Sequence, residues 1–219
     1  NFLTCSNANG IGPIIQEKGI DRNGWMLTGA ITFNRSNVDI FNSSFIDINS
    51  EDALNIVSSD FNIQGCFFSK LASDAFDGDF VSGTIKDCYF SEISGDGVDF
   101  SGSNAVVRNC VFKNITDKAI SVGEGSNVKV SSCIVNNVSF GIVSKDLSVT
   151  KASNNTITSA KTAAFAAFQK KNSFGPATII ISESKISDCK QLILIQDGSV
   201  GSLNDQIVQT SVFKTTELY

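Results

Sequence analysis

A short phrase of acidic residues followed by apolar ones returns about every 22 residues through the middle of the chain. Its four copies are Glu51–Ile56, Ser73–Asp77, Gly95–Phe100 and Asp117–Val122. A fixed period of this length is typical of repeat proteins, in which each repeat packs only on its neighbours. The period therefore predicts a stacked, elongated fold, whatever the activity of the chain.

Two further columns run parallel to the acidic phrase, one of cysteines at spacings of 22, 22 and 23 residues and one of aliphatic residues. Their members are Cys66, Cys88, Cys110 and Cys133, and Ile40, Ile63, Ile85, Val107 and Val130. Three alternating segments per period, separated by Gly, Asn, Asp and Ser, predict three strands and three turns. We therefore predict an all-β, single-stranded parallel β-helix with about 22 residues per coil and seven to eight coils.

We expect the whole chain, residues 1–219, to form one β-helix domain. Regular coils should occupy 30–197, with irregular caps at 1–29 and 198–219, because open sheet edges occur only at the two ends of such a fold. The period lengthens to 28 residues once, and the excess predicts a longer loop at 169–176. Loops that interrupt a regular scaffold often bind ligands, but repeat proteins also tolerate insertions without a function.

Composition excludes several classes of function. The net charge of −5 and the three arginines argue against a nucleic-acid partner, which would need clustered positive charge. No apolar run approaches the roughly 20 residues of a membrane span. The chain has no histidine, which removes Ser-His-Asp and Cys-His nucleophiles and His-ligated zinc. Any chemistry must therefore use carboxylates, Lys, Arg, Tyr or a hard metal ion.

The outward side chains of the first strand in each coil predict a metal site. Residues one period apart stack about 4.8 Å apart, so carboxylates in one column repel each other unless a proton, a lysine or a cation intervenes. The outward column reads Thr32, Asn55, Asp77, Asp99, Ser121 and Val143, with Asp79 two residues beyond Asp77. Asp77, Asp79 and Asp99 are therefore candidate Ca²⁺ ligands. The alternative is that they are solvated surface carboxylates.

Five other residues are candidates for binding a substrate on this face. Asn55 and Ser121 would contribute neutral oxygens, and Lys145 lies near the same strand. Lys170 and Lys171 belong to the longer loop, which would offer them to an anionic ligand.

A second acidic column, Asp52, Asp74 and Asp96 followed by Lys118, precedes the strand, and we expect it at a turn. There the carboxylates would bond backbone N–H groups, with Lys118 ending the acidic run. Pairing Asp77 with Asp99 as the acid and base of a glycosidase is a further alternative. The cysteine column is interpreted as buried thiols packed in the core rather than as disulfides or metal ligands. Cys5 and Cys189 stay unassigned.

The rungs resemble the right-handed β-helix repeats of the pectate-lyase-like superfamily. Gly97–Phe100 and Gly141–Val143 resemble its short-coil group, which includes periplasmic copper-maturation proteins and alginate-epimerase-type repeats. Five further phrases resemble uncharacterised microbial surface β-helix modules: Glu51–Ile56, Ser73–Phe80, Gly95–Ser103, Asp117–Glu124 and Phe174–Ile181. The likeness covers about residues 30–196 and implies a right-handed coil. Polygalacturonases of this fold use Asp-Asp with Gly-His-Gly, and alginate epimerases use Asp-Pro-His-Asp; both motifs are absent here. Pectate lyases combine Ca²⁺-binding carboxylates with a base, and only their carboxylate half is matched, by Asp77, Asp79 and Asp99.

Taken together, these features predict an extracellular or cell-surface β-helix module that binds a polysaccharide or cell-surface glycan on the first-strand face, with Ca²⁺ as the expected ion. Two alternatives stay open. One is a polysaccharide lyase or hydrolase that uses the same groove, and the other is a structural spacer or adhesion module.

Overall fold

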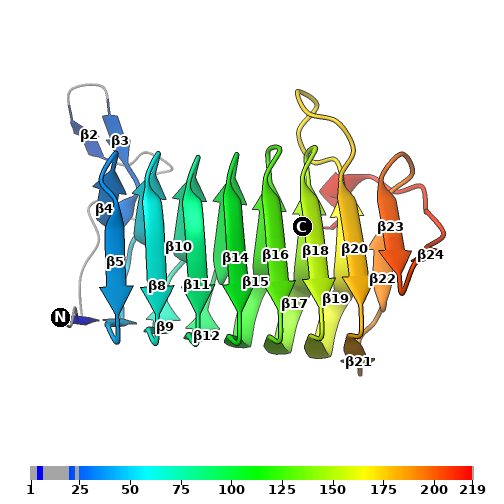
Figure 1. The fold of residues 1–219 in the computed structure, drawn as a ribbon, viewed down its shortest axis with the longest axis horizontal. Coiled ribbons are helices and arrows are strands. Elements are labelled where there is room, and N and C mark those ends of the chain that lie inside the picture. Colours follow the sequence, from blue (N-terminus) through cyan, green and yellow to red (C-terminus); the bar gives the residue numbers. More distant parts are fainter. Residues whose placement is uncertain (1–3, 7–19, 23–24, 219) are drawn as a thin grey trace.

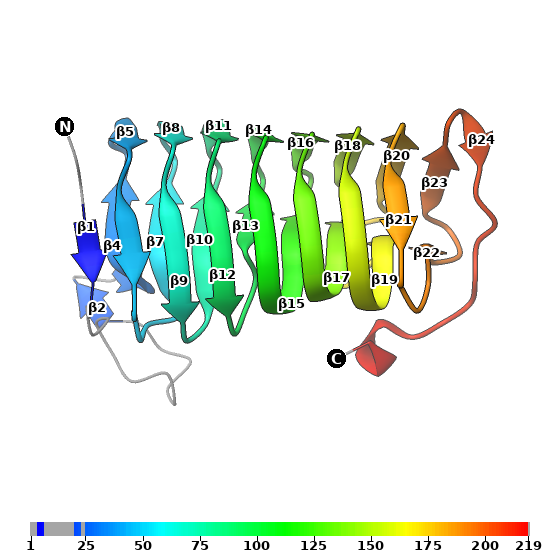
Figure 2. The ribbon, with the colours of Figure 1, turned by 90° about the horizontal axis from the view of Figure 1, so that it is seen from below.

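The computed structural model describes residues 4–6, 20–22 and 25–218, with side chains from Thr28 onward. Within these residues the chain is a right-handed parallel β-helix of about eight coils, so the predicted all-β fold is confirmed (Figures 1 and 2). Pairs such as Asn55 with Asp77 and Asp77 with Asp99 lie side by side on neighbouring strands. The 22-residue period therefore corresponds to one complete coil of the β-helix.

Each coil presents three faces. The second face is a nine-stranded sheet, whose order runs without crossing from one end of the molecule to the other. Its strands are β5 (Val38–Phe41), β8 (Asp60–Gln64), β11 (Ser82–Lys86), β14 (Asn104–Arg108), β16 (Asn127–Ser131), β18 (Val149–Ser153), β20 (Thr178–Ser182), β23 (Val200–Leu203) and β24 (Gln206–Ile207).

The first and third faces form one thirteen-stranded sheet that turns a corner. The first face comprises β4 (Gly29–Asn34), β7 (Asp52–Val57), β10 (Asp74–Asp79), β13 (Val98–Ser101), the later halves of β15 (Val111–Gly123), β17 (Ile134–Lys145) and β19 (Thr156–Phe168), and β22 (Ile193–Ile195). The third face comprises β1 (Thr4–Ser6), β6 (Ser44–Ile46), β9 (Phe67–Leu71), β12 (Tyr89–Ile93), the earlier halves of β15, β17 and β19, and β21 (Lys185–Ser187).

The expected three separate strands hold in the early coils, where β7, β8 and β9 are distinct. In the middle coils the third strand and the next first strand are continuous, as in β15, so the third turn is a bend within a strand. The pairing of β15 with β17 shifts register between Ile115 and Lys118, which places an irregularity at that bend. Such irregularities let a strand change direction without breaking its ladder.

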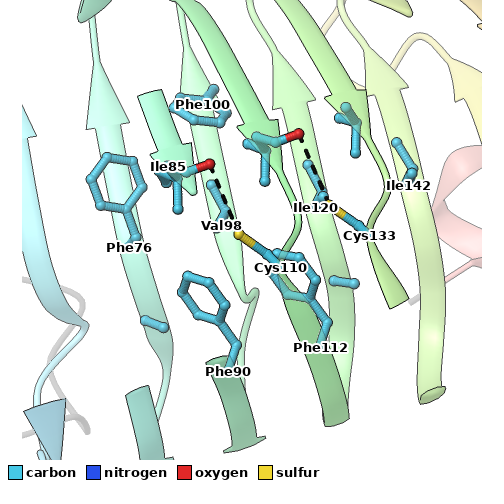
Figure 3. Packing of buried hydrophobic residues seen from close by; sticks show 14 of the residues in the cluster. Phe76, Ile85, Phe90, Val98, Phe100, Cys110, Phe112, Ile120, Cys133 and Ile142 are labelled. Atoms are coloured by element: carbon cyan, nitrogen blue, oxygen red, sulfur yellow. Dashed lines mark hydrogen bonds between the residues drawn. The ribbon is translucent and has the colours of Figure 1, made fainter. Parts of the chain in front are cut away.

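The interior is filled by stacked apolar columns (Figure 3). Phe45, Phe68, Phe90 and Phe112 form a continuous stack with ring centroids 4.5–4.7 Å apart. The inward positions of the first strand, which alternate with the outward column, are all fully buried: Leu54, Ile56, Phe76, Val98, Phe100, Ile120 and Val122. Residues of one type therefore pack on their counterparts one coil away, which keeps the coil cross-section constant.

The cysteine column lies in this core, as predicted. Cys66, Cys88, Cys110 and Cys133 are free and buried, and each thiol points at a carbonyl oxygen of the preceding coil, as Cys110 does toward Ile85. The residue before each cysteine has a positive φ, which suits the Gly, Asp, Asn and Ser types found there. These residues are Gly65, Asp87, Asn109 and Ser132, and Asn154 continues the column.

A second corner carries a column of serines. The backbone N–H of Val81 donates to Ser103 Oγ at 2.9 Å, the N–H of Ser103 donates to Ser126 Oγ at 2.9 Å, and the N–H of Ser126 donates to Ser148 Oγ at 3.1 Å. Each amide thus finds its acceptor one coil later in the chain. Corner amides that no strand pairs are satisfied in this way.

The ends of the coil are closed differently. At one end β1 pairs with β6, and β2 (Ile20–Arg22) forms a short antiparallel hairpin with β3 (Trp25–Leu27). At the other end β23 continues the parallel ladder within the segment expected as a cap, and antiparallel β24 ends the sheet. No helix in the described part of the chain has the length and hydropathy of a membrane span.

The C-terminal segment then runs back along the last coils to the 3₁₀ turn η1 (Thr215–Glu217) (Figure 2). Phe213 and Leu218 pack on a second, smaller apolar cluster, separate from the coil interior. The cluster comprises Phe140, Val143, Ala163, Ala166, Phe168 and Leu194. Val143 lies in the outward column of the first face yet is fully buried. The expectation that this column faces solvent is therefore wrong at the last coils, because the C-terminal segment covers them.

Candidate functional site

The early coils of the first face carry six aspartates on two adjacent columns, which we call the acidic cluster. One column contains Asp77 and Asp99 with Asp79 beside them. The other, at the corner where the strands begin, contains Asp52 and Asp74, the first residues of β7 and β10, and Asp96, two residues before β13; the sequence prediction placed this column before the strand. Parallel pairing brings Asp77 opposite Asp99, and Asp74 opposite Asp52. The repeat thus concentrates residues 52–99 onto one patch.

The strand column is less exposed than its outward direction predicts. Asn55 and Ser121 are 4% and 0% exposed, and the three aspartates are half-buried. The expectation that Asn55 and Ser121 face solvent is wrong, because each is buried between its column neighbours, Asn55 between Thr32 and Asp77 and Ser121 between Asp99 and Val143. The Asn55 amide donates to Asp77 Oδ2 at 3.0 Å and to Asp79 Oδ2 at 3.5 Å. Asn55 therefore holds two of the three predicted metal ligands side by side.

The corner column has the structural role that the sequence predicts. Asp74 Oδ1 accepts the backbone N–H of Asp96 at 2.7 Å, and Asp96 Oδ1 accepts the backbone N–H of Lys118 at 2.9 Å. The Lys118 ammonium, only 2% exposed, lies 3.3 Å from Asp96 Oδ1 and also contacts Asp117. Lys118 therefore ends the acidic run with an ion pair, as expected.

The corner column also contributes to a close group of three carboxylates that the sequence prediction missed. One carboxylate oxygen from each of Asp74, Asp96 and Asp99 lies within 4.8 Å of the other two. Of the predicted ligands, only Asp99 belongs to this group, while Asp77 and Asp79 flank it. The spacing Asp96-Gly-Val-Asp99 was the available signal, since a bend between the two residues turns both side chains to one side.

Burial governs the electrostatics of the cluster. Desolvation raises the pKa of Asp52 to about 7 and that of Asp96 to about 6, the latter against the opposing charge of Lys118. Desolvation, reinforced by neighbouring carboxylates, raises the pKa of Asp74 and Asp77 well above the ordinary aspartate value. The pKa of Asp79 is raised by the same desolvation. Full ionisation of the cluster at neutral pH is therefore costly without a compensating positive charge.

Three buried oxygens in and beside the cluster have no hydrogen-bond partner: Asp52 Oδ2, Asp99 Oδ1 and Ser121 Oγ. Ser121 stands directly opposite Asp99 in the parallel register. Buried polar atoms are nearly always paired in native proteins, and an unpaired one calls for a specific cause such as an ion or a water molecule.

The predicted lysines do lie at the end of the cluster toward the later coils, and each of them interacts with neighbouring groups. The Lys145 ammonium is 3.4 Å from Asp99 Oδ2, and Lys171 forms an ion pair with Glu124. Desolvation lowers the pKa of Lys170, and the charges of Lys145 and Lys118 add to the effect.

The loop that carries Lys170 and Lys171 connects β19 to β20 and is fixed by a buried aspartate. Asp146 Oδ1 accepts the backbone N–H groups of both lysines at 2.7 Å. The N–H of Leu147 donates to the Gly175 carbonyl at 2.9 Å. These bonds hold both ends of the loop, so Lys170 and Lys171 are presented on an ordered segment.

Comparison with known proteins defines the class. The family model described as right handed beta helix region matches residues 28–175 and 82–214, and the chain therefore belongs to that family. Among solved structures, two mutants of the periplasmic alginate epimerase AlgG superpose with TM-scores of 0.55 and 0.57 at 12% and 11% identity. Each match covers 81% of this chain and 51% of the epimerase, so the chain spans about half the length of that enzyme. No curated protein matches the sequence.

Proposed function

We propose that this β-helix is an extracellular or cell-surface module that binds a polysaccharide or cell-surface glycan across the acidic cluster. The observation that carries the proposal is the column of Asn55, Asp77 and Asp99, whose amide and carboxylate groups recur one coil apart on a rigid sheet. Sugar hydroxyls are recognised by such fixed, partly desolvated hydrogen-bonding groups. The fold that it shares with a periplasmic alginate epimerase supports the same class of ligand by analogy.

Ca²⁺ is part of this proposal. Asp77 and Asp79, held together by Asn55, and Asp99 offer carboxylate oxygens that a bound Ca²⁺ could share with hydroxyl or acidic groups of a glycan. Lys170, on the ordered loop, would face the same ligand, with Lys145 and Lys171 beside it. Ser121 adds a hydroxyl beside Asp99.

Glycan-array binding followed by calorimetry with the best oligosaccharides, in Ca²⁺ and in EDTA, tests the proposal. We expect saturable binding that Asp77→Asn and Asn55→Ala weaken, while Asp60→Asn, at an exposed position on the second face, leaves it unchanged. Absence of binding across neutral and acidic glycans in both buffers would overturn the proposal and favour a structural spacer.

A second candidate, a polysaccharide lyase or hydrolase on the same face, is favoured by one observation. Burial raises the pKa of Asp52 to about 7, which keeps a carboxylic acid protonated close to neutral pH, the state that a general acid needs. Incubation with uronate and neutral polysaccharides would reveal it through unsaturated products or new reducing ends. We expect Asp52→Asn to abolish any such activity, and silence across the substrate panel would reject this candidate.

A further inference from the structure

We infer that Asp74, Asp96 and Asp99 form a divalent-cation site, with Ser121 as a neutral ligand and Ca²⁺ as the preferred ion. The site lies on the face proposed to bind carbohydrate, but it does not depend on a glycan being bound. It also differs from the trio Asp77, Asp79 and Asp99 that the strand spacing predicts. The two sites share only Asp99, so substitutions can separate them.

The geometry of the three carboxylates suits one ion. Two oxygens that each lie about 2.4 Å from a Ca²⁺ ion can be at most about 4.8 Å apart. One oxygen from each of Asp74, Asp96 and Asp99 meets that limit with respect to the other two. Backbone pairing between β10 and β13 fixes Asp99, and the N–H of Asp96 fixes Asp74, so the set is held before any ion binds.

The local charge also calls for a cation. Lys118 and Lys145 form ion pairs with Asp96 and Asp99. If all six carboxyl groups of the acidic cluster were ionised, they would outnumber the ammonium groups around them, even with Lys170 and Lys171 counted. A doubly charged ion at this point would neutralise the excess and lower the cost of keeping the carboxylates ionised.

The second observation that points to a ligand is Ser121. Its side chain is fully buried, its Oγ has no hydrogen-bond partner, and it lies opposite Asp99 on the neighbouring strand. Asp99 Oδ1 is likewise buried and unpartnered. A cation between these residues would satisfy both atoms at once, whereas nothing else in the described part of the chain does.

The ligand chemistry selects the ion class. Every candidate donor is a carboxylate or hydroxyl oxygen, which favours Ca²⁺, Mg²⁺ or Mn²⁺ over zinc or copper. Mg²⁺ demands a near-ideal octahedron with oxygens at about 2.0–2.1 Å, which carboxylates held by the backbone of two different columns would have to move to supply. Ca²⁺ accepts irregular sets of six to eight oxygens, with water molecules completing its shell, so it fits better than Mg²⁺.

Titration of the EDTA-treated protein with CaCl₂, MgCl₂ and TbCl₃, followed by calorimetry and by Tb³⁺ luminescence, tests the site without any glycan. In the absence of glycan we expect one ion per chain, with Ca²⁺ bound more tightly than Mg²⁺, because the Ca²⁺ proposed at Asp77, Asp79 and Asp99 would be shared with a bound glycan. Asp74→Asn and Asp99→Asn should weaken binding about tenfold or more, because each removes one charged ligand. Each asparagine keeps an oxygen that can still accept a hydrogen bond, and circular dichroism in EDTA verifies folding.

Asp79→Asn distinguishes this site from the strand trio of Asp77, Asp79 and Asp99, because Asp79 belongs only to the trio. Asp60→Asn, on the second face, is the control variant far from both sites. Retained affinity in both, with loss in Asp74→Asn, supports the inference. Loss in Asp79→Asn with no loss in Asp74→Asn would place the ion at the strand trio and overturn it, as would the absence of Ca²⁺ binding at millimolar concentration. Glycan binding measured in EDTA reports on the proposed function separately, so either idea can fail without the other.

Discussion

The ammonium group of Lys145 lies 3.4 Å from Asp99 Oδ2, although 46 residues separate them along the chain. To reach Asp99 the side chain passes Gly123, where the methyl group of an alanine would lie only 2.7 Å from Lys145 Cε. Gly123 therefore provides the space through which a lysine from β17 neutralises an aspartate on β13. This contact joins the acidic cluster to the later coils.

Gly123→Ala should displace Lys145 and destabilise the protein by about 1–3 kcal/mol, the usual cost of overpacking a tight site. Chemical denaturation measures the change. In a Lys145→Ala background the same substitution should cost much less, because the clashing side chain is gone. Equal costs in the two backgrounds would show that Gly123 is needed for some other reason.

Lys118→Met tests the buried ion pair with Asp96. The substitution leaves Asp96 buried without its partner, a change that typically costs about 3–5 kcal/mol when the remaining group is charged. Because the charge of Lys118 lowers the pKa of Asp96, its loss should raise that pKa above the present value of about 6. The destabilisation should therefore be large at pH 8 and smaller at pH 5, where Asp96 takes up a proton. A pH-independent loss would contradict this account.

The cation-free protein should lose stability as the pH rises from about 4 to above 7. The folded-state pKa of Asp52 is about 7 and that of Asp96 about 6, against 3.8 for an unperturbed aspartate, so the folded state binds more protons across this window. Stability then falls with increasing pH. Thermal melts in EDTA from pH 4 to pH 8 measure the slope, and Asp52→Asn should flatten it. A melting temperature that rises across the window would refute the sign.

Phe90→Ala should destabilise the protein by about 3–5 kcal/mol, because it opens a cavity in the phenylalanine stack. Phe90 is fully buried between Phe68 and Phe112, with ring centroids 4.7 Å away on each side. The matched control is its neighbour Tyr89, which stacks on Phe67 outside the coil. Tyr89→Ala should cost no more than about 1.5 kcal/mol. Similar losses for both variants would mean that the inner stack is not the main source of stability.

The sequence predicted those parts of the fold that depend on strict periodicity. Residues such as Phe76 and Val98 recur one coil apart, and that alone places them in one buried column. The left-handed corner at Asp87 and Asn109 was predictable for the same reason, since residue type and period agree.

What the sequence could not predict arises where two columns meet. The approach of Asp96 to Asp99 depends on a bend at the corner; the spacing Asp96-Gly-Val-Asp99 hints at that bend, but the 22-residue period does not predict it. The burial of Val143 depends on Phe213 and Leu218, which lie outside the repeat. Lys145 reaches Asp99 only because the column that it crosses holds a glycine. Local spacing gives columns, but contacts between columns require the three-dimensional path of the chain.

The hydrogen bonds at the serine corner and at the aspartate corner run in opposite directions along the chain. The amide of Val81 donates to Ser103, which is synthesised one coil later, whereas the amide of Asp96 donates to the carboxylate of Asp74, which is synthesised one coil earlier. During synthesis from the N-terminus, the acidic corner of each new coil can therefore close as soon as that coil is laid down. An amide at the serine corner gains its acceptor only when the following coil is added. A nascent chain halted between Asp96 and Ser103 would therefore already satisfy the amide of Asp96, whereas the amide of Val81 would still lack its acceptor.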